Sequence, residues 1–171
     1  MPSTRTTYRK LVAKLTSGEL VRVGKGIYAK PTDLEGIEGD FYRATLLCGK
    51  KSTICLLSAL NFYGLSEQLF GGVWILVPYT SYVPRKKFLR VIRSRSPHWV
   101  MGIRSTSRYK ITNIERSIVD AFRYQRLVGI STAIYALKTA LKENQTTKAK
   151  VYDMAKKLGV AKRLLPYLET L

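Results

Sequence analysis

The sequence has few acidic residues and few of the side chains that build metal sites. It contains eleven Asp and Glu against thirty Lys and Arg, with one histidine and two cysteines. Cys48 and Cys55 lack the paired spacing of a zinc site, so we expect reduced, buried thiols and no metal. Gly71-Gly72 lacks the residues that follow in a phosphate loop or a dinucleotide fingerprint. We therefore expect a protein without a metal or a cofactor.

Long hydrophobic runs are also missing. No apolar stretch approaches the roughly 20 residues needed to span a bilayer, and no signal-peptide segment follows Met1. We expect a cytoplasmic protein with no membrane partner. The chain has 171 residues, of which 46% are hydrophobic, and this length is sufficient to bury a core without disulfide or metal staples.

The basic residues, by contrast, are abundant and unevenly placed. The formal net charge is +19, and a field of this strength attracts polyanions. Residues 1–31 hold seven Lys and Arg against one acid, and residues 80–110 hold nine bases and no acid, whereas residues 32–79 are slightly acidic. Two basic clusters separated by an acidic segment favour a nucleic-acid surface over charge that serves solubility alone.

Periodicity predicts an α+β (mixed α/β) fold in two parts, residues 1–31 and 32–171. The first part contains a helix over residues 3–17 and a hairpin over residues 20–29 with glycines at its turn. Residues 32–37 resemble a linker. The second part contains, in order, helices 39–50 and 52–63, strands 73–77 and 88–93, one or two short strands within 102–112, and helices 114–127, 131–142, 146–157 and 160–170.

The first part matches the last helix and the wing of a winged helix-turn-helix. An α-helix fits the major groove, where arginine reads guanine edges and lysines grip phosphates. The alternative is a plain amphipathic helix with a solvated basic face. The predicted DNA contacts are base-facing Arg5, Thr6, Arg9 and Lys10, and phosphate-facing Lys14, Arg22 and Lys25.

A second basic surface is predicted in the middle of the chain. Aromatic side chains beside cations can stack nucleobases while the cations hold the backbone. The alternative is a solvated loop leading into an edge strand, whose lysines discourage strand addition. The predicted members are Tyr82, Arg85, Lys86, Lys87, Arg90, Arg93 and Arg95.

No catalytic centre is visible in the sequence, and we expect a protein that is not an enzyme. His98 has no acid near it in the chain, and we expect it on a surface or packed turn. Glu115 and Asp120 are five positions apart on a predicted helix, which places them about 140° apart around its axis. We expect helix-start electrostatics for Glu115 and pairing with a nearby base for Asp120.

Several phrases taken together resemble the AbiEi family of antitoxin regulators from type IV toxin–antitoxin systems. Gly18 to Tyr28 resembles the family's wing, Leu57 to Leu65 its "SAL-x-x-x-GL" helix, and Val73 to Pro78 the strand that follows. Asn113 to Arg123 is similar to its "ER-T/S-x-x-D" helix, and Val160 to Glu169 to its C-terminal helices. The resemblance covers nearly the whole chain.

The resemblance implies a winged-helix repressor joined to an α/β antitoxin domain. Such proteins bind inverted repeats upstream of their own operon and counter a toxin that resembles nucleotidyltransferases. By position, residues 3–17 would be the recognition helix and residues 20–29 the wing. Members of the family have two further helices before the recognition helix, which this sequence lacks before residue 3.

The leading hypothesis is therefore a DNA-binding autorepressor and antitoxin whose partners are double-stranded operator DNA and a nucleotidyltransferase-like toxin. The main alternative is a general RNA- or single-strand-binding protein that uses the surface from Tyr82 to Arg95. A degenerate nuclease or nucleotidyltransferase relative, for which Asp120 is the residue to test, and a pure protein-interaction role remain open.

Overall fold

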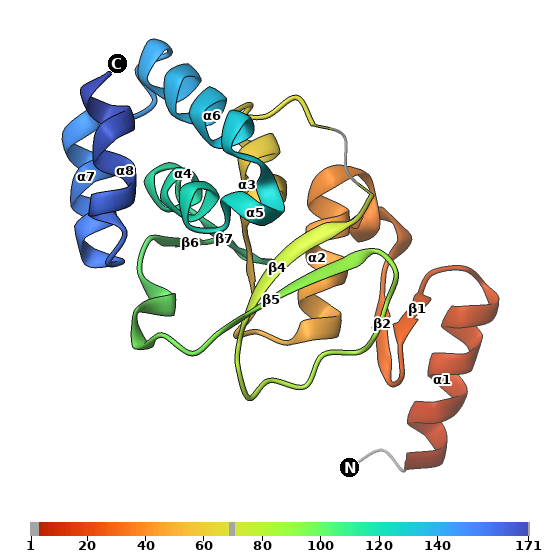
Figure 1. Ribbon diagram of the computed structural model, residues 1–171. Coiled ribbons are helices and arrows are strands. Elements are labelled where there is room, and N and C mark those ends of the chain that lie inside the picture. Colours follow the sequence, from red (N-terminus) through yellow and green to blue (C-terminus); the bar gives the residue numbers. More distant parts are fainter. Residues whose placement is uncertain (1–3, 69–70, 171) are drawn as a thin grey trace.

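The computed structural model describes residues 4–68 and 71–170, with side chains described from Tyr8 onward. It contains a two-stranded hairpin, a five-stranded sheet and helices on both faces of that sheet (Figure 1). The mixed α and β composition predicted from the sequence is confirmed. The elements in chain order are α1 (Thr4–Thr16), β1 (Val21–Gly24), β2 (Ile27–Ala29), η1 (Pro31–Leu34), α2 (Gly36–Cys48), β3 (Thr53–Ile54), α3 (Leu56–Phe62), β4 (Val73–Pro78), β5 (Leu89–Ser94), η2 (Pro97–Val100), β6 (Ile103–Ser105), β7 (Lys110–Thr112), α4 (Ile114–Arg123), α5 (Gln125–Val128), α6 (Ile130–Lys142), α7 (Lys148–Lys157) and α8 (Ala161–Glu169).

The larger sheet is mixed and has the strand order β5-β4-β3-β7-β6. β4 pairs in parallel with β5, β3 pairs antiparallel with β4 and in parallel with β7, and β6 pairs antiparallel with β7. β4 has a continuous apolar run with Val73, Ile75, Leu76 and Val77 all buried. Such a run is typical of a strand covered on both faces, and the strand predicted at residues 73–77 is confirmed.

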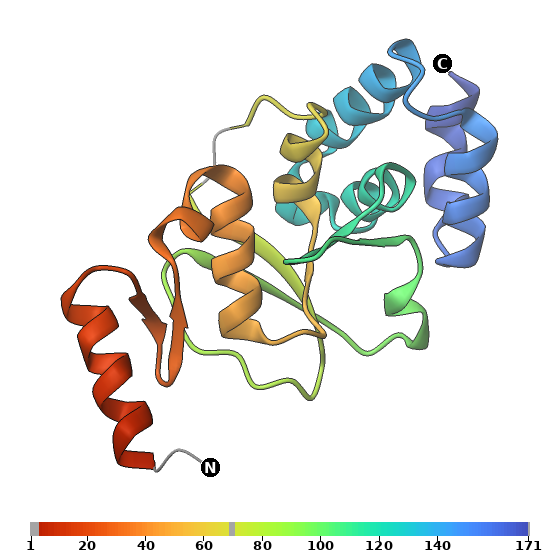
Figure 2. The same cartoon turned by 180° about the vertical axis from the view of Figure 1, so that it is seen from behind.

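Two hydrophobic clusters lie on opposite faces of this sheet. Phe41 and Ala44 of α2 pack against Ile75 and Val77 on one face. On the other face α4 is the central helix, and its Phe122 packs among α3, α6, α7 and α8. Figure 1 and Figure 2 show the same layering, with α2 on one side of the sheet and α4, α6, α7 and α8 on the other.

The helix and hairpin predicted at the start of the chain are present and project from the rest of the molecule (Figure 2). The hairpin packs on α2 through Gly24, where an added Cβ would lie 2.8 Å from Leu47 Cδ2. Both turn glycines permit positive φ, and Gly26 adopts it, with φ +69°. The apolar stripe of α1 is poorly covered, since Tyr8 is 67% and Val12 41% exposed.

The helix predicted at residues 52–63 is wrong at its start. Thr53–Ile54 forms the central strand β3, and α3 begins only at Leu56. Ile54 is fully buried and pairs with Ile75 on β4 and Ile111 on β7. The strand is stabilised by partners distant in sequence, so the helical period of the residues that follow misled the prediction.

The prediction of a linker at residues 32–37 is also wrong, because η1 and the first turn of α2 occupy these residues. The later predictions are confirmed within a few residues at each end. The helix predicted over residues 114–127 breaks at Tyr124 into α4 and α5. Among the residues described, none of the helices is long and apolar enough to cross a bilayer.

Candidate nucleic-acid interface

The segment that joins β4 to β5 carries the densest group of cations. Parallel neighbours need a crossover, which is usually helical, but residues 79–88 cross the sheet without a helix. Val83 and Phe88 pack against the core cluster on the α2 side and hold the segment down. The side chains between these anchors point outward, and Arg85, Lys86 and Lys87 are exposed.

The edge position of β5 extends this group. β5 is the last strand of the sheet, and Arg90 on it is exposed. Residues 80–110 contain no acid, and none of the ion pairs between described residues involves Arg85, Lys86, Lys87 or Arg90. These four side chains therefore present positive charge that no carboxylate of the described residues neutralises. We call them the crossover cations.

Arg93 and Arg95, predicted to belong to the same surface, have contacts inside the protein. Arg93 Nη1 donates to the carbonyl oxygens of Tyr79 (2.9 Å) and Ser81 (2.7 Å). The Arg95 guanidinium lies 3.9 Å from the centroid of the Tyr79 ring. Both side chains thus fix the first half of the crossover, and we assign them a positioning role. Tyr82, between these contacts and the cations, is 87% exposed.

Among the N-terminal cations, too, some are exposed and others have contacts within the protein. Arg9, Lys10 and Lys25 are exposed, with Lys25 at the hairpin turn. Lys14 Nζ pairs with Glu19 Oε1 at 2.7 Å, which neutralises part of its charge. Arg22 Nε donates to the Gly24 carbonyl at 3.2 Å and braces the turn. The predicted side chains of Arg5 and Thr6 lie outside the described residues.

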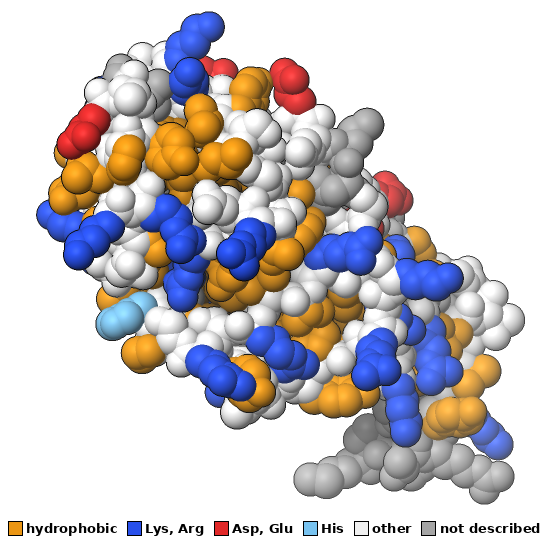
Figure 3. Space-filling model, in the orientation of Figure 1, with side chains coloured by type: hydrophobic (Ala, Val, Ile, Leu, Met, Phe, Trp, Pro, Cys, Tyr) orange, Lys and Arg blue, Asp and Glu red, His pale blue; other side chains and the backbone are white. Residues whose placement is uncertain are grey.

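Both basic segments pack on the same side of the sheet. The hairpin contacts α2 through Gly24 and Leu47, and the crossover packs through Val83 and Phe88 on the cluster that contains Phe41. Figure 3 shows Lys and Arg side chains spread across one face of the molecule, while the Asp and Glu side chains visible there lie near its rim. Folding thus brings together two cationic segments that are far apart in the sequence.

The residues considered for catalysis lie on η2 and α4, and Arg116 links two of them, His98 and Asp120. The described residues contain no group of three His, Cys, Asp or Glu side chains that could hold a metal ion. His98 is exposed on η2, as predicted for a turn position. Glu115 lies in the first turn of α4, where its carboxylate accepts a hydrogen bond from Thr146 Oγ1 at 2.7 Å.

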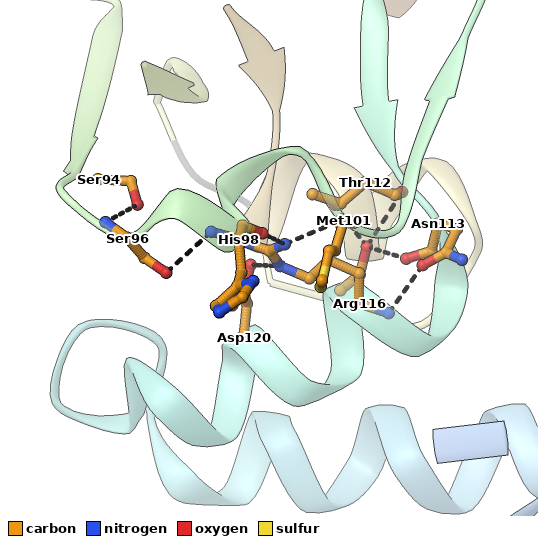
Figure 4. Close-up of polar contacts among 9 residues, drawn as sticks. Ser94, Ser96, His98, Met101, Thr112, Asn113, Arg116 and Asp120 are labelled. Atoms are coloured by element: carbon orange, nitrogen blue, oxygen red, sulfur yellow. Dashed lines mark hydrogen bonds and ion pairs between the residues drawn. The ribbon is translucent and has the colours of Figure 1, made fainter. Parts of the chain in front are cut away.

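Asp120 forms a buried ion pair, which confirms the predicted pairing with a base. Arg116 Nε donates to Asp120 Oδ2 at 2.6 Å, and both side chains are only 3% exposed. Arg116 Nη1 also donates to the carbonyls of Met101 (2.7 Å) and His98 (3.3 Å), as Figure 4 shows. The pair therefore ties α4 to the segment that follows β5. Burial raises the pKa of the Asp120 carboxyl, and the Arg116 guanidinium opposes that effect.

Both cysteines are free and buried, as expected from the sequence. Burial raises the pKa of the Cys48 thiol to about 11. A thiol with so high a pKa holds little thiolate at neutral pH, which is characteristic of a structural rather than a reactive cysteine.

One cavity was not predicted from the sequence. Arg43 on α2 and Asn61 on α3 both line it, together with Ser58. No motif connects these positions, because they lie on two different helices, α2 and α3, which folding brings near each other. A search for polar residues within otherwise apolar helix faces would have been the only sequence signal.

No protein-family model matches the chain, and no curated protein matches it in sequence.

Proposed function

We propose that this protein binds double-stranded DNA and acts as the transcriptional autorepressor and antitoxin of a type IV toxin–antitoxin system. The observation that supports DNA binding most directly is the set of crossover cations. They are exposed, have no carboxylate partner among the described residues, and lie on the same side of the sheet as the basic hairpin. Backbone phosphates supply most of the non-specific affinity of DNA-binding proteins. Regulation and antitoxin action are supported by the resemblance to the AbiEi family.

In this proposal α1 and the β1–β2 hairpin are the recognition helix and wing of a partial winged helix. Arg9 and Lys10 are exposed on the helix and Lys25 is exposed at the hairpin turn, as contact with a groove and its phosphates requires. Lys14 and Arg22 each already have one contact within the protein, with Glu19 and with the Gly24 carbonyl, respectively. The first contacts are therefore assigned to Arg9, Lys10, Lys25 and the crossover cations.

A salt titration tests DNA binding. Fluorescence anisotropy with the chain's own upstream duplex, set against a scrambled duplex, gives the affinity at each salt concentration. Lys25 and the four crossover cations supply five phosphate contacts, which predict a slope of log affinity against log salt of about −4.5. The operator proposal also requires tighter binding to the upstream duplex. Absence of binding at low salt contradicts the DNA proposal, and equal affinity for both duplexes contradicts the repressor role.

The antitoxin role has a separate test. Co-expression with a nucleotidyltransferase-like toxin encoded by the adjacent gene should restore growth, and a variant of the crossover cations shows whether rescue depends on DNA binding. If growth is not restored although the toxin is expressed and the antitoxin is folded, the antitoxin role is contradicted. DNA binding is then judged by the salt titration alone.

A second candidate function is binding of RNA or single strands, and the exposure of Tyr82 favours it. An aromatic ring in solvent beside cations can stack an unpaired base, which a duplex does not offer. The same cations would then hold the single-strand backbone. The two functions differ in their dependence on this one ring.

Tyr82→Ala distinguishes them. If DNA binding is the function, affinity for duplex DNA changes less than about twofold, because Tyr82 carries no charge that contributes to phosphate binding. If single strands are the ligand, loss of one stacked base weakens binding by about 1–3 kcal/mol. Tyr82→Phe is the control, since it keeps the ring and should retain single-strand affinity. Competition between duplex DNA and single-stranded RNA at one salt concentration provides the measurement.

A further inference from the structure

A cavity on the α4 side of the sheet is lined largely by arginine side chains. It lies where the end of α4, the short helix α5 and the start of α8 meet, and its volume is about 540 Å³. This size is within the roughly 300–1,000 Å³ that ligand pockets occupy. None of its lining residues is acidic, and the lining is made of Arg123, Tyr124, Gln125, Arg126, Leu127 and Arg163. We call Arg123, Arg126 and Arg163 the arginine cluster.

Contacts within the protein locate two of the three guanidinium groups at this place. Arg163 Nη1 donates to the carbonyl oxygen of Arg123 at 3.1 Å, which brings this side chain from α8 to the end of α4. The Arg123 guanidinium lies 5.6 Å from the centroid of the Tyr124 ring, and Tyr124 also lines the cavity. A guanidinium has five N–H donors, so the contact to the carbonyl fixes Arg163 and leaves its other donors for further acceptors.

The charge of the arginine cluster is not balanced by carboxylates. None of the ion pairs between described residues involves Arg123, Arg126 or Arg163. Arg123 lowers the pKa of the Asp120 carboxyl, although burial raises that pKa overall. The Asp120 side chain is only 3% exposed, however, and it is already paired with Arg116 at 2.6 Å. Like charges at one cavity repel one another, and an anion from solution would offset this repulsion.

The start of α8 adds to the positive potential. Arg163 lies in the first turn of α8, which contains no acidic residue, and Lys162 precedes it. The N-terminal end of a helix carries about half a positive charge, so a cation is unfavourable there and an anion is favourable. A bound anion would therefore stabilise Arg163 in the position that it occupies.

A phosphate monoester has the charge and the oxygen atoms that suit the arginine cluster. Its terminal phosphate carries a charge of about −1.5 to −2 at pH 7 and has three acceptor oxygens. Guanidinium groups bind phosphate oxygens through pairs of parallel hydrogen bonds. A carboxylate has one charge and two oxygens, and a backbone phosphodiester has one charge, so each balances less of the cluster. Leu127 and the Tyr124 ring provide an apolar wall for the remainder of the ligand.

We propose that the arginine cluster binds the terminal phosphate of a phosphate monoester. The phosphate belongs either to a free small molecule, such as a nucleoside monophosphate, or to the 5′ end of a nucleic-acid strand. The crossover packs on the α2 side of the sheet, whereas Phe122 and Tyr124 beside the cluster belong to the core on the α4 side (Figure 1). The site is therefore separate from the crossover cations and does not depend on duplex binding.

NMR titration of the full chain at 0.15 M salt tests the proposal. The reporters are the Nε–Hε signals of the arginine cluster, each assigned by its disappearance when that arginine is replaced by glutamine. Inorganic phosphate, glycerol 3-phosphate and adenosine 5′-monophosphate should shift these signals in a saturable way. Adenosine, which has no phosphate, should not shift them. Adenosine 3′,5′-cyclic monophosphate, whose phosphate has no free end, should bind at least about tenfold more weakly than the 5′-monophosphate, because it loses charged hydrogen bonds.

A tetranucleotide with and without a 5′-phosphate distinguishes the two sources of the phosphate. If the phosphorylated strand binds more tightly than adenosine 5′-monophosphate and the unphosphorylated strand does not, the ligand is a strand end. If the phosphorylated strand binds no more tightly than the monophosphate, the ligand is a free small molecule.

Variants connect binding to this cavity. Arg126→Gln and Arg163→Gln should each weaken binding of adenosine 5′-monophosphate about tenfold or more, since each removes a hydrogen bond between charged groups. Lys138→Gln is the matched control, because it removes an equal charge from an exposed position outside the cavity. Arg163→Gln also removes the contact to α4. If that variant does not fold, Arg126→Gln decides, because Arg126 is exposed.

Three results overturn the proposal. The first is that no phosphate monoester shifts the signals of the arginine cluster in a saturable way. The second is that cyclic adenosine monophosphate or tetraglutamate binds as tightly as adenosine 5′-monophosphate, which would mean that the cluster attracts anions of any kind. The third is that Lys138→Gln weakens binding as much as Arg126→Gln, which would mean that net charge alone accounts for it.

Discussion

Replacing the crossover cations Arg85, Lys86, Lys87 and Arg90 together by glutamine should reduce the affinity for duplex DNA on the order of 10³-fold near 0.1 M salt. Each lost phosphate contact removes about 0.9 from the salt slope, so four lost contacts reduce its magnitude by about 3.6. The effect is large because the four side chains are exposed and have no carboxylate partner among the described residues. Anisotropy titrations at several salt concentrations measure both quantities.

The matched control removes the same charge from another surface. Lys138 and Lys142 on α6 and Lys148 and Lys150 on α7 are exposed, and their replacement by glutamine also lowers the net charge by four. If the crossover cations bind DNA, this control keeps most of the salt slope. Equal loss in both variants would mean that net charge alone, and no particular surface, attracts the DNA.

Asp120→Ala should lower the free energy of unfolding by about 3–5 kcal/mol, the usual result of leaving one partner of a buried ion pair uncompensated. Arg116 is 3% exposed and would retain its charge without the 2.6 Å contact to a carboxylate. In a chain of this size the loss lowers the melting temperature by roughly 2–4 °C per kcal/mol. Chemical denaturation followed by circular dichroism measures the change.

A double variant shows whether the loss comes from the unpaired charge. Arg116→Met combined with Asp120→Leu removes both charges with apolar side chains of similar length, and such replacements are often neutral. It should recover much of the stability lost in Asp120→Ala, less the two hydrogen bonds that Arg116 donates to His98 and Met101. A double variant no more stable than Asp120→Ala would contradict this account of the pair. Metal-dependent turnover that Asp120→Ala abolishes would instead support the nuclease or nucleotidyltransferase alternative.

Local patterns were sufficient for most of the elements. The apolar run at residues 73–77 and the helical periods after Asn113 predicted β4, α4, α6, α7 and α8, because burial on one stripe or on both faces leaves a period in the sequence. The pairing of Asp120 with a base was also predicted, since Arg116 lies one helical turn away. Positions whose partners are near in the chain were therefore predictable.

Long-range contacts decided the rest. Thr53–Ile54 is too short to show a period of its own, and it is a strand because β4 and β7 pair with it on either side. Arg93 and Arg95 are assigned to holding the crossover rather than to binding a ligand. The reason is that folding places the Tyr79 and Ser81 carbonyls beside Arg93 and the Tyr79 ring beside Arg95. No local pattern reports such a partner.

The sequence by itself determined that the chain is strongly basic, that its cations gather in two segments, and that α and β elements are mixed. Composition and periodicity are local properties, and each residue contributes to them wherever it lies in space. Only the tertiary structure decided which cations remain unpaired, that the two segments share one side of the sheet, and that Arg43 and Asn61 meet in one cavity. These depend on distances between residues far apart in the chain, which are set when the core packs.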